Sequence, residues 1–142
     1  MAFDPASDYP LGQKRPDLVA TPSGLQLEEV TLAALRAGRL AWEDLRATPE
    51  TLGRQSAVAL AAGRRPLADN LARAAELATI PDETILQIYS ALRPHRSTGE
   101  QLEAWAAQLD ELDAPLTAAF VREARAVYAE RGLLRIGERT PA

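Results

Sequence analysis

The stretch from Ile80 to Thr98 constrains the fold most, because it predicts a helix, a corner and the start of another helix. Pro81 suits the first turn of a helix, where its missing N–H costs little. Four apolar residues then recur at i, i+3, i+4 and i+7, on one helical stripe: Ile85, Ile88, Tyr89 and Leu92. Pro94 ends this helix, since the residue before a proline avoids the helical region. Ser97, with Glu100 three residues later, predicts a capping box for the next helix.

Similar start and stop signals divide most of the remaining chain into short helices. Thr48 is expected to cap a helix that Pro49 begins and Gly63 ends, because proline suits the first helical position and glycine the position after the last. Pro66 opens the next helix, and Asp113 caps the last one. The expected helical ranges are 27–37, 49–62, 66–78, 81–93, 98–112 and 114–131, with a helical turn at 42–45.

Apolar side chains on these helices define the expected core. Within 27–37, Leu32 and Leu35 are expected to be buried. The last helix is expected to bury one face: Leu116, Phe120, Ala124, Val127 and Tyr128. No run alternates strongly enough to predict a strand. The sequence therefore predicts an all-α fold, a compact bundle of five or six short helices with an extended, proline-rich N-terminal arm.

Residues 1–24 differ from the rest of the chain, because they contain four prolines and no helical period. This composition predicts an extended arm with turns, in which Tyr9 and Leu11 are the apolar anchors. Composition alone leaves open a disordered tail or an arm that lies on a partner surface. We expect three regions: the arm over 1–24, a single helical domain over 25–134 and a C-terminal tail over 135–142.

Composition narrows the class of protein. The length of 142 residues fits one domain, and aromatic residues make up only 5% of the chain, so Leu and Ala do most of the packing. The net charge of −4 argues against a nucleic-acid partner. The absence of cysteine excludes disulfides and thiolate chemistry. No apolar stretch of about 18 residues suits a membrane span, and the N-terminus lacks a secretory pattern. We therefore expect a cytoplasmic protein.

No catalytic or metal-binding set is visible. His95 is the only histidine, and without cysteine it cannot build a histidine-rich metal site. A Ser97–His95 pair is conceivable, but sequence neighbours rarely have catalytic geometry. Acidic groups such as Glu43-Asp44 are expected to lie on a solvated face. Phosphate-loop and dinucleotide motifs are absent. We therefore predict no catalytic, cofactor-binding or metal-binding residue in this chain.

The corner formed by Arg93, Pro94, His95 and Arg96, here called the basic corner, has three interpretations. Its guanidinium groups could grip a phosphate or carboxylate. They could instead complement a helix C-terminus or form salt bridges within the chain. The third interpretation is a subunit contact, because arginine is enriched at interfaces. We rank the second and third equally, and both above the binding of a small anion.

Several short motifs occur in an order and spacing that resemble one known family. They are Asp8–Leu11, Arg73–Leu77, Ile80–Asp82, Ile88–Tyr89, Ala91–Pro94, Arg96–Thr98, Ala118–Glu123 and Val127–Tyr128. Over roughly 8–134 the chain resembles the small subunit of adenosylcobalamin-dependent diol and glycerol dehydratases.

The resemblance implies a complex with a large and a medium subunit, assembled as a dimer of heterotrimers. The large subunit would be a barrel that holds the substrate, and the adenosylcobalamin would lie between the large and medium subunits. The complex would convert a 1,2-diol or glycerol into an aldehyde and water by a radical mechanism. The small subunit would sit on the large subunit, supply no catalytic residue and bind no cofactor itself.

The resemblance at Asp8-Tyr9-Pro10 favours an arm that lies on a partner. The residues that we expect at the subunit interface are Tyr9, Leu11, Arg93, His95 and Arg96. Some family members carry an N-terminal extension that is linked to packaging inside bacterial microcompartments. Only seven residues precede Asp8 here, so we expect no packaging by this segment.

Three alternatives stay open at the level of sequence. One is a free-standing helical adaptor that binds another protein through the basic corner and the arm. Another is a small helical enzyme with an unrecognised site. The last is a helix-turn-helix DNA-binding protein built on the Ser97 corner, which the net charge of −4 disfavours.

Overall fold

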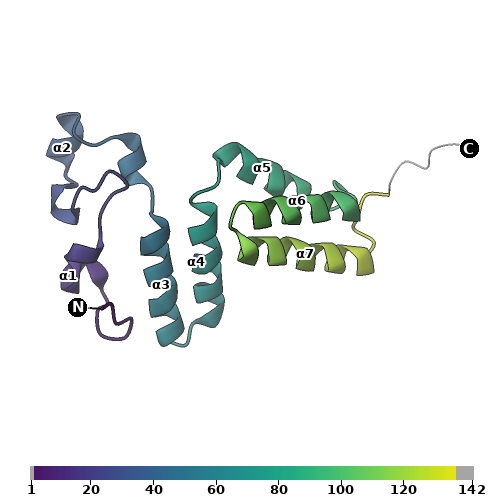
Figure 1. The fold of residues 1–142 in the computed structure, drawn as a ribbon, viewed down its shortest axis with the longest axis horizontal. Coiled ribbons are helices and arrows are strands. Elements are labelled where there is room, and N and C mark those ends of the chain that lie inside the picture. The colour runs from purple at the N-terminus through teal and green to yellow at the C-terminus, as the bar shows by residue number, and fades with distance from the viewer. Residues whose placement is uncertain (1, 137–142) are drawn as a thin grey trace, which may run out of the picture. The chain divides into compact units, whose positions relative to one another are not determined.

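The computed structural model describes residues 2–136 and is built from helices (Figure 1). The α-helices are α1 (Leu11–Lys14), α2 (Leu32–Arg36), α3 (Pro49–Ala61), α4 (Arg65–Leu77), α5 (Asp82–Ala91), α6 (Gly99–Glu111) and α7 (Pro115–Glu130). Short 3-10 helices are η1 (Pro16–Leu18), η2 (Leu27–Glu29) and η3 (Trp42–Leu45). Within the described range, β pairing is limited to one isolated bridge between Ala20 and Gln26. The predicted all-α fold is confirmed.

The chain divides into two compact units, Met1–Ala78 and Thr79–Ala142. The helical domain expected over 25–134 therefore draws on both units, and its outer boundaries stay a prediction. Of the C-terminal tail expected over 135–142, only 135 and 136 belong to the described residues.

The N-terminal segment is more folded than an extended arm. It contains α1 and η1, and Pro16 takes the first position of η1, where the fixed φ of proline suits a helical turn as well as an extended one. Arg54 of α3 anchors the segment, because its Nη1 donates to the carbonyl oxygen of Leu18 at 2.6 Å. The segment is thus part of the first unit.

The helix expected over 27–37 is broken in the middle. Thr31 caps α2, accepting a hydrogen bond on Oγ1 from the Ala34 N–H at 3.1 Å, so the chain restarts a helix there. The prediction that Leu32 and Leu35 are buried is wrong, since they are 60% and 46% exposed. Ala34 is the residue of α2 that is buried.

Helices α3 and α4 form an antiparallel pair in the first unit (Figure 1). Thr48 caps α3 as expected, and Gly63 ends it with a φ of 70°, which glycine adopts without strain. Ala59 and Ala68 are buried, and the Ser56 hydroxyl donates to the Ala68 carbonyl at 2.8 Å. Small residues at this contact let the two backbones approach closely.

Helices α6 and α7 form a second antiparallel pair, in the second unit (Figure 1). Its core consists of side chains that are at most 1% exposed: Leu102, Ala106, Leu109, Ala114, Ala118 and Val121. Three of these six are alanines, so the large side chains of one helix pack against the small ones of the other.

Two details of this unit differ from the sequence prediction by one residue. Thr98, not Ser97, caps α6, and its partner in the capping box is Gln101 rather than Glu100. Ala114, not Asp113, is the N-cap of α7.

The buried face of α7 is also rotated from the expected one. Thr117, Ala118 and Val121 are buried, whereas Leu116 and Phe120 are 50% and 40% exposed. The reason is that α6 already fills the groove with leucines, so α7 presents its small residues there.

Candidate functional site

The basic corner joins α5 to α6 and is held by the segment that follows α7. The His95 N–H donates to the Leu133 carbonyl at 2.7 Å, and the Arg135 N–H donates to the Ser97 carbonyl at 2.9 Å. The buried Ser97 hydroxyl donates to the Ala91 carbonyl at 2.9 Å. These bonds give the corner a defined backbone, in which His95 has a φ of 60°.

The side chains of the corner point outward. Arg93, His95 and Arg96 are exposed, and within residues 2–136 none of these three side chains has a hydrogen bond or ion pair. The two guanidinium groups and the imidazole are therefore open to a partner. The internal salt bridge, one of the interpretations from the sequence, is not formed within the described residues 2–136.

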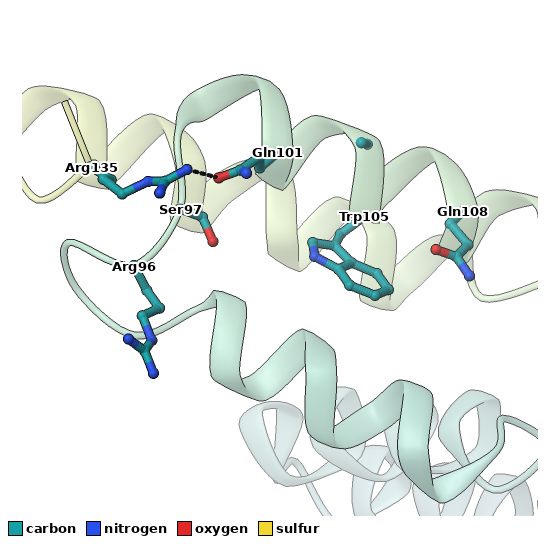
Figure 2. A pocket seen from close by; sticks show the side chains of 7 residues that line it. Arg96, Ser97, Gln101, Trp105, Gln108 and Arg135 are labelled. Carbon is teal, nitrogen blue, oxygen red and sulfur yellow. Dashed lines mark hydrogen bonds between the residues drawn. The ribbon is translucent and has the colours of Figure 1, made fainter. Parts of the chain in front are cut away.

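A hollow of about 430 Å³ lies beside the corner, and we call it the corner pocket. Its lining residues are Arg96, Ser97, Gln101, Ala104, Trp105, Gln108 and Arg135. Figure 2 shows the Trp105 ring and the Gln108 side chain projecting from the same side of α6. Arg135 points toward Gln101, to whose Oε1 it donates at 3.1 Å (Figure 2).

The other predicted interface residues belong to the first unit. Tyr9 is 59% exposed, whereas Leu11 is only 8% exposed and contributes to the core. Both line a mostly apolar groove of about 700 Å³, here called the arm groove, between the N-terminal segment, α3 and α4. Its apolar lining includes Val19, Leu27, Val58, Ala59, Leu67 and Leu71.

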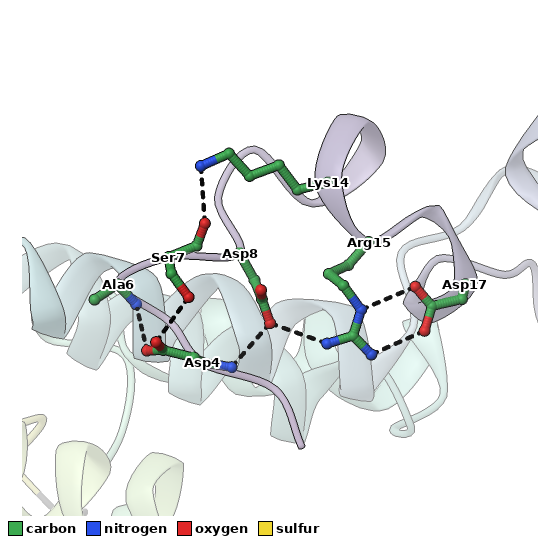
Figure 3. A network of polar contacts seen from close by, with 7 residues as sticks. All are labelled: Asp4, Ala6, Ser7, Asp8, Lys14, Arg15 and Asp17. Atoms are coloured by element: carbon green, nitrogen blue, oxygen red, sulfur yellow. Dashed lines mark hydrogen bonds and ion pairs between the residues drawn. The ribbon is translucent and has the colours of Figure 1, made fainter. Parts of the chain in front are cut away.

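A polar network fixes the N-terminal segment beside Tyr9 (Figure 3). Arg15 grips Asp17 with two hydrogen bonds of 3.0 and 2.9 Å, and it also reaches Asp8 at 3.0 Å. The hydrogen bonds from Arg15 hold the pKa of Asp17 below its ordinary value. Asp8 in turn accepts a hydrogen bond from the Asp4 N–H at 2.9 Å. This network positions the backbone on either side of Tyr9 and Leu11.

Asp44 is a buried carboxylate that the sequence analysis placed on a solvated face, and that prediction is wrong. Its oxygens accept hydrogen bonds from the backbone N–H groups of Ser23 at 3.3 Å and Ala41 at 2.9 Å. Hydrogen bonding from Ser23 and Ala41 lowers the pKa of Asp44. Asp44 therefore ties η3 to the loop before η2. The contact with Ala41 is local, but no local signal marks the contact with Ser23, which is 21 residues away in sequence.

Residues 2–136 contain no group of three or more His, Cys, Asp or Glu side chains placed to hold a metal ion. No helix among them is long and apolar enough to cross a membrane.

Comparison with known proteins identifies the family. The family model described as dehydratase small subunit matches residues 5–135. The chain belongs to the dehydratase small subunit family. The resemblance stated from the sequence motifs is thereby confirmed, and so is the prediction that the chain is an accessory subunit of a dehydratase.

Two curated relatives support this membership in the dehydratase small subunit family. The propanediol dehydratase small subunit of Salmonella typhimurium is 48% identical over 130 residues, which cover 91% of this chain and 75% of the relative. The protein of the same name from Citrobacter freundii is 47% identical over 130 residues, covering 91% of this chain and 76% of the relative.

Within this dehydratase small subunit, the five predicted interface residues fall in two places. Tyr9 and Leu11 lie at the arm groove of the first unit, and Arg93, His95 and Arg96 lie at the basic corner of the second. Their contact with another subunit stays a prediction. Trp105 and Arg135 are surface residues that the sequence analysis did not select, although both line the corner pocket.

Proposed function

We propose that this chain binds the large catalytic subunit of an adenosylcobalamin-dependent diol dehydratase and stabilises it. The observation that carries the proposal is the family match over 5–135, together with relatives at 48% and 47% identity that are named propanediol dehydratase small subunits. The substrate class that we assign to the complex is therefore a 1,2-diol, with propanediol preferred to glycerol.

The chain's own residues support a binding role. Many large apolar side chains are exposed, among them Tyr9, Trp42, Leu86 and Tyr89 at 59%, 65%, 68% and 58%. Exposed apolar side chains and unpaired arginines are typical of surfaces that a partner covers. We assign the arm groove and the basic corner to the interface, with Tyr9, Leu11, Arg93, His95 and Arg96 as contact residues.

The proposal places the chemistry elsewhere in the complex. The adenosylcobalamin would bind between the large and medium subunits and supply the adenosyl radical that starts the dehydration. This chain contributes no ligand to it; its residues hold the partner in a stable fold. The complex would be a dimer of heterotrimers in the cytoplasm, and its microcompartment association is left to other segments or subunits.

Co-expression with the large and medium subunits tests the proposal, with an affinity tag on this chain. We expect a three-component complex with adenosylcobalamin-dependent dehydration of 1,2-propanediol. Without this chain, activity and soluble large subunit should fall, because a partner that binds only the folded state stabilises it. Recovery of this chain alone, with undiminished activity of the other two subunits, would overturn the proposal.

A further inference from the structure

The corner pocket is lined by hydrogen-bond donors and lacks an acid. None of the seven residues that line it is Asp or Glu, although the chain has 20 acidic residues against 16 basic ones. Arg96 and Arg135 bring two guanidinium groups to this one hollow. The pocket is therefore locally positive, although the chain as a whole has a net charge of −4. Its chemistry suits an anionic group.

Several of these donors have no internal partner. Among the described residues, no hydrogen bond or ion pair involves the side chains of Arg96, Trp105 or Gln108. The side-chain oxygens of Gln101 and Ser97, by contrast, are engaged. Gln101 Oε1 accepts both from the Thr98 N–H at 3.0 Å and from Arg135 at 3.1 Å, and the Ser97 hydroxyl is oriented toward the Ala91 carbonyl. The pocket therefore offers open donors to a ligand and few open acceptors.

The size and the surroundings of the corner pocket favour a protein segment over a free ion as its ligand. A volume of about 430 Å³ exceeds what one carboxylate fills. The partly buried Trp105 ring adds an apolar wall, against which the methylene groups of an acidic side chain can pack. The guanidinium group of Arg93, which is exposed and has no partner among residues 2–136, extends the positive surface next to the pocket.

We propose that the corner pocket binds an acidic side chain, Asp or Glu, from a segment of the large subunit. This inference rests on the proposed function and names the chemistry of one contact within it. Arg96 takes the carboxylate through its planar guanidinium, which matches the two carboxylate oxygens. Trp105 and Gln108 contact the rest of the segment, and Gln101 orients Arg135.

The lysine content of the chain offers a direct test, because Lys14 is the only lysine. In a Lys14→Arg background, Arg96→Lys places the one side-chain amine of the chain in the pocket and keeps its charge. A zero-length carbodiimide reagent joins an amine to a carboxylate that touches it. We would treat the purified three-subunit complex with this reagent and locate the linked peptides by mass spectrometry.

We expect position 96 to link to an Asp or Glu of the large subunit. The matched control is Arg36→Lys in the same background, at an exposed position in the last turn of α2, which should give no comparable link. Arg96→Ala should weaken assembly about thirtyfold or more, as the loss of one partner of a desolvated charge pair does.

Other outcomes would overturn the inference. An intact complex with no link at position 96, or with links only to carboxylates of this chain, excludes an acidic partner residue but leaves the proposed function standing. Stabilisation of the isolated wild-type chain by inorganic phosphate, without the link, would make the pocket a small-anion site. Failure of the wild-type chain to form a complex would instead remove the proposed function itself.

Discussion

The hydroxyl of Tyr128, on α7, donates a hydrogen bond of 2.6 Å to the carbonyl oxygen of Leu92, at the C-terminal end of α5. Leu92 directly precedes the basic corner, so this bond fixes one side of the corner to α7. Residues 133–135 fix the other side through the backbone. The corner is thus positioned by hydrogen bonds between residues that lie 36 or more positions apart in the chain.

Tyr128→Phe should lower the free energy of unfolding by about 1 kcal/mol, the usual contribution of one hydrogen bond. Urea unfolding of the full chain, followed by circular dichroism, measures the change. The matched control is Tyr89→Phe, because the Tyr89 side chain is 58% exposed and has no hydrogen-bond partner among the described residues. Equal losses in the two variants would contradict this assignment.

Asp44→Asn should destabilise the chain at neutral pH, because it removes the charge that the N–H groups of Ser23 and Ala41 stabilise. The hydrogen bonds from Ser23 and Ala41 hold the folded-state pKa of Asp44 below its ordinary value. Its contribution is therefore present above pH 3.8 and is lost as the pH falls through the lower, folded-state pKa.

The measurement for Asp44→Asn is the difference in urea midpoint between wild type and variant at pH 7 and at pH values progressively below 3.8. That difference should shrink with acidification. Glu43→Gln, at the exposed neighbouring position, is the control. Its urea midpoint should differ little from that of the wild type, both at pH 7 and at the lower pH values. A difference for Asp44→Asn that grows with acid would show that the carboxylate is not stabilised in its charged form.

Leu109→Ala should destabilise the second unit by about 2–5 kcal/mol, because it leaves a cavity between α6 and α7 where the side chain is 0% exposed. Leu86→Ala, on α5 at 68% exposure, should change the unfolding free energy by no more than about 0.5 kcal/mol. Thermal and urea unfolding of the two variants test the described core. Similar losses in both would mean that Leu86 is packed in the isolated chain.

Tyr9→Ala should weaken binding to the large subunit about tenfold, since exposed aromatic residues often dominate an interface. The fold of the Tyr9→Ala variant should be little changed, because the Tyr9 side chain is 59% exposed. Leu60→Ala is a matched loss of apolar surface on α3, at 56% exposure and outside the arm groove. Biolayer interferometry with immobilised large subunit measures the affinities of the two variants and of the wild type. Equal affinities for Tyr9→Ala and wild type would exclude the arm groove from the interface.

Local chemistry made much of this fold predictable from sequence. The two ends of α3 were predicted from Thr48-Pro49 and Gly63. This was possible because capping and the left-handed turn depend on the residues at those positions alone. Caps were misplaced by one residue where two suitable side chains are adjacent, as at Ser97 and Thr98. In that case the capping geometry, rather than the residue type, decides.

Faces were harder to predict than helix ends. Leu116 and Phe120 are large apolar residues of the kind that usually form a core, and yet they are half exposed. Thr117 and Ala118, which are smaller, are buried instead. Hydrophobic periodicity does not distinguish a side chain that packs within the chain from one that a partner covers. Exposed leucines on α2 have the same ambiguity.

Contacts between distant segments were beyond sequence reasoning. The basic corner was predicted from its composition, but the corner pocket was not, because Arg135 joins it through hydrogen bonds to Ser97 and Gln101, which are distant in sequence. Asp44 was missed for a similar reason, since its Ser23 partner lies in another loop.

The most direct test of the account is the affinity of this chain for the isolated large dehydratase subunit, measured by titration calorimetry. The account predicts saturable 1:1 binding of the two chains and a rise in the unfolding temperature of the large subunit on adding this chain. A large subunit whose unfolding temperature does not change, together with no heat of binding, would contradict the claim that this chain is its stabilising partner.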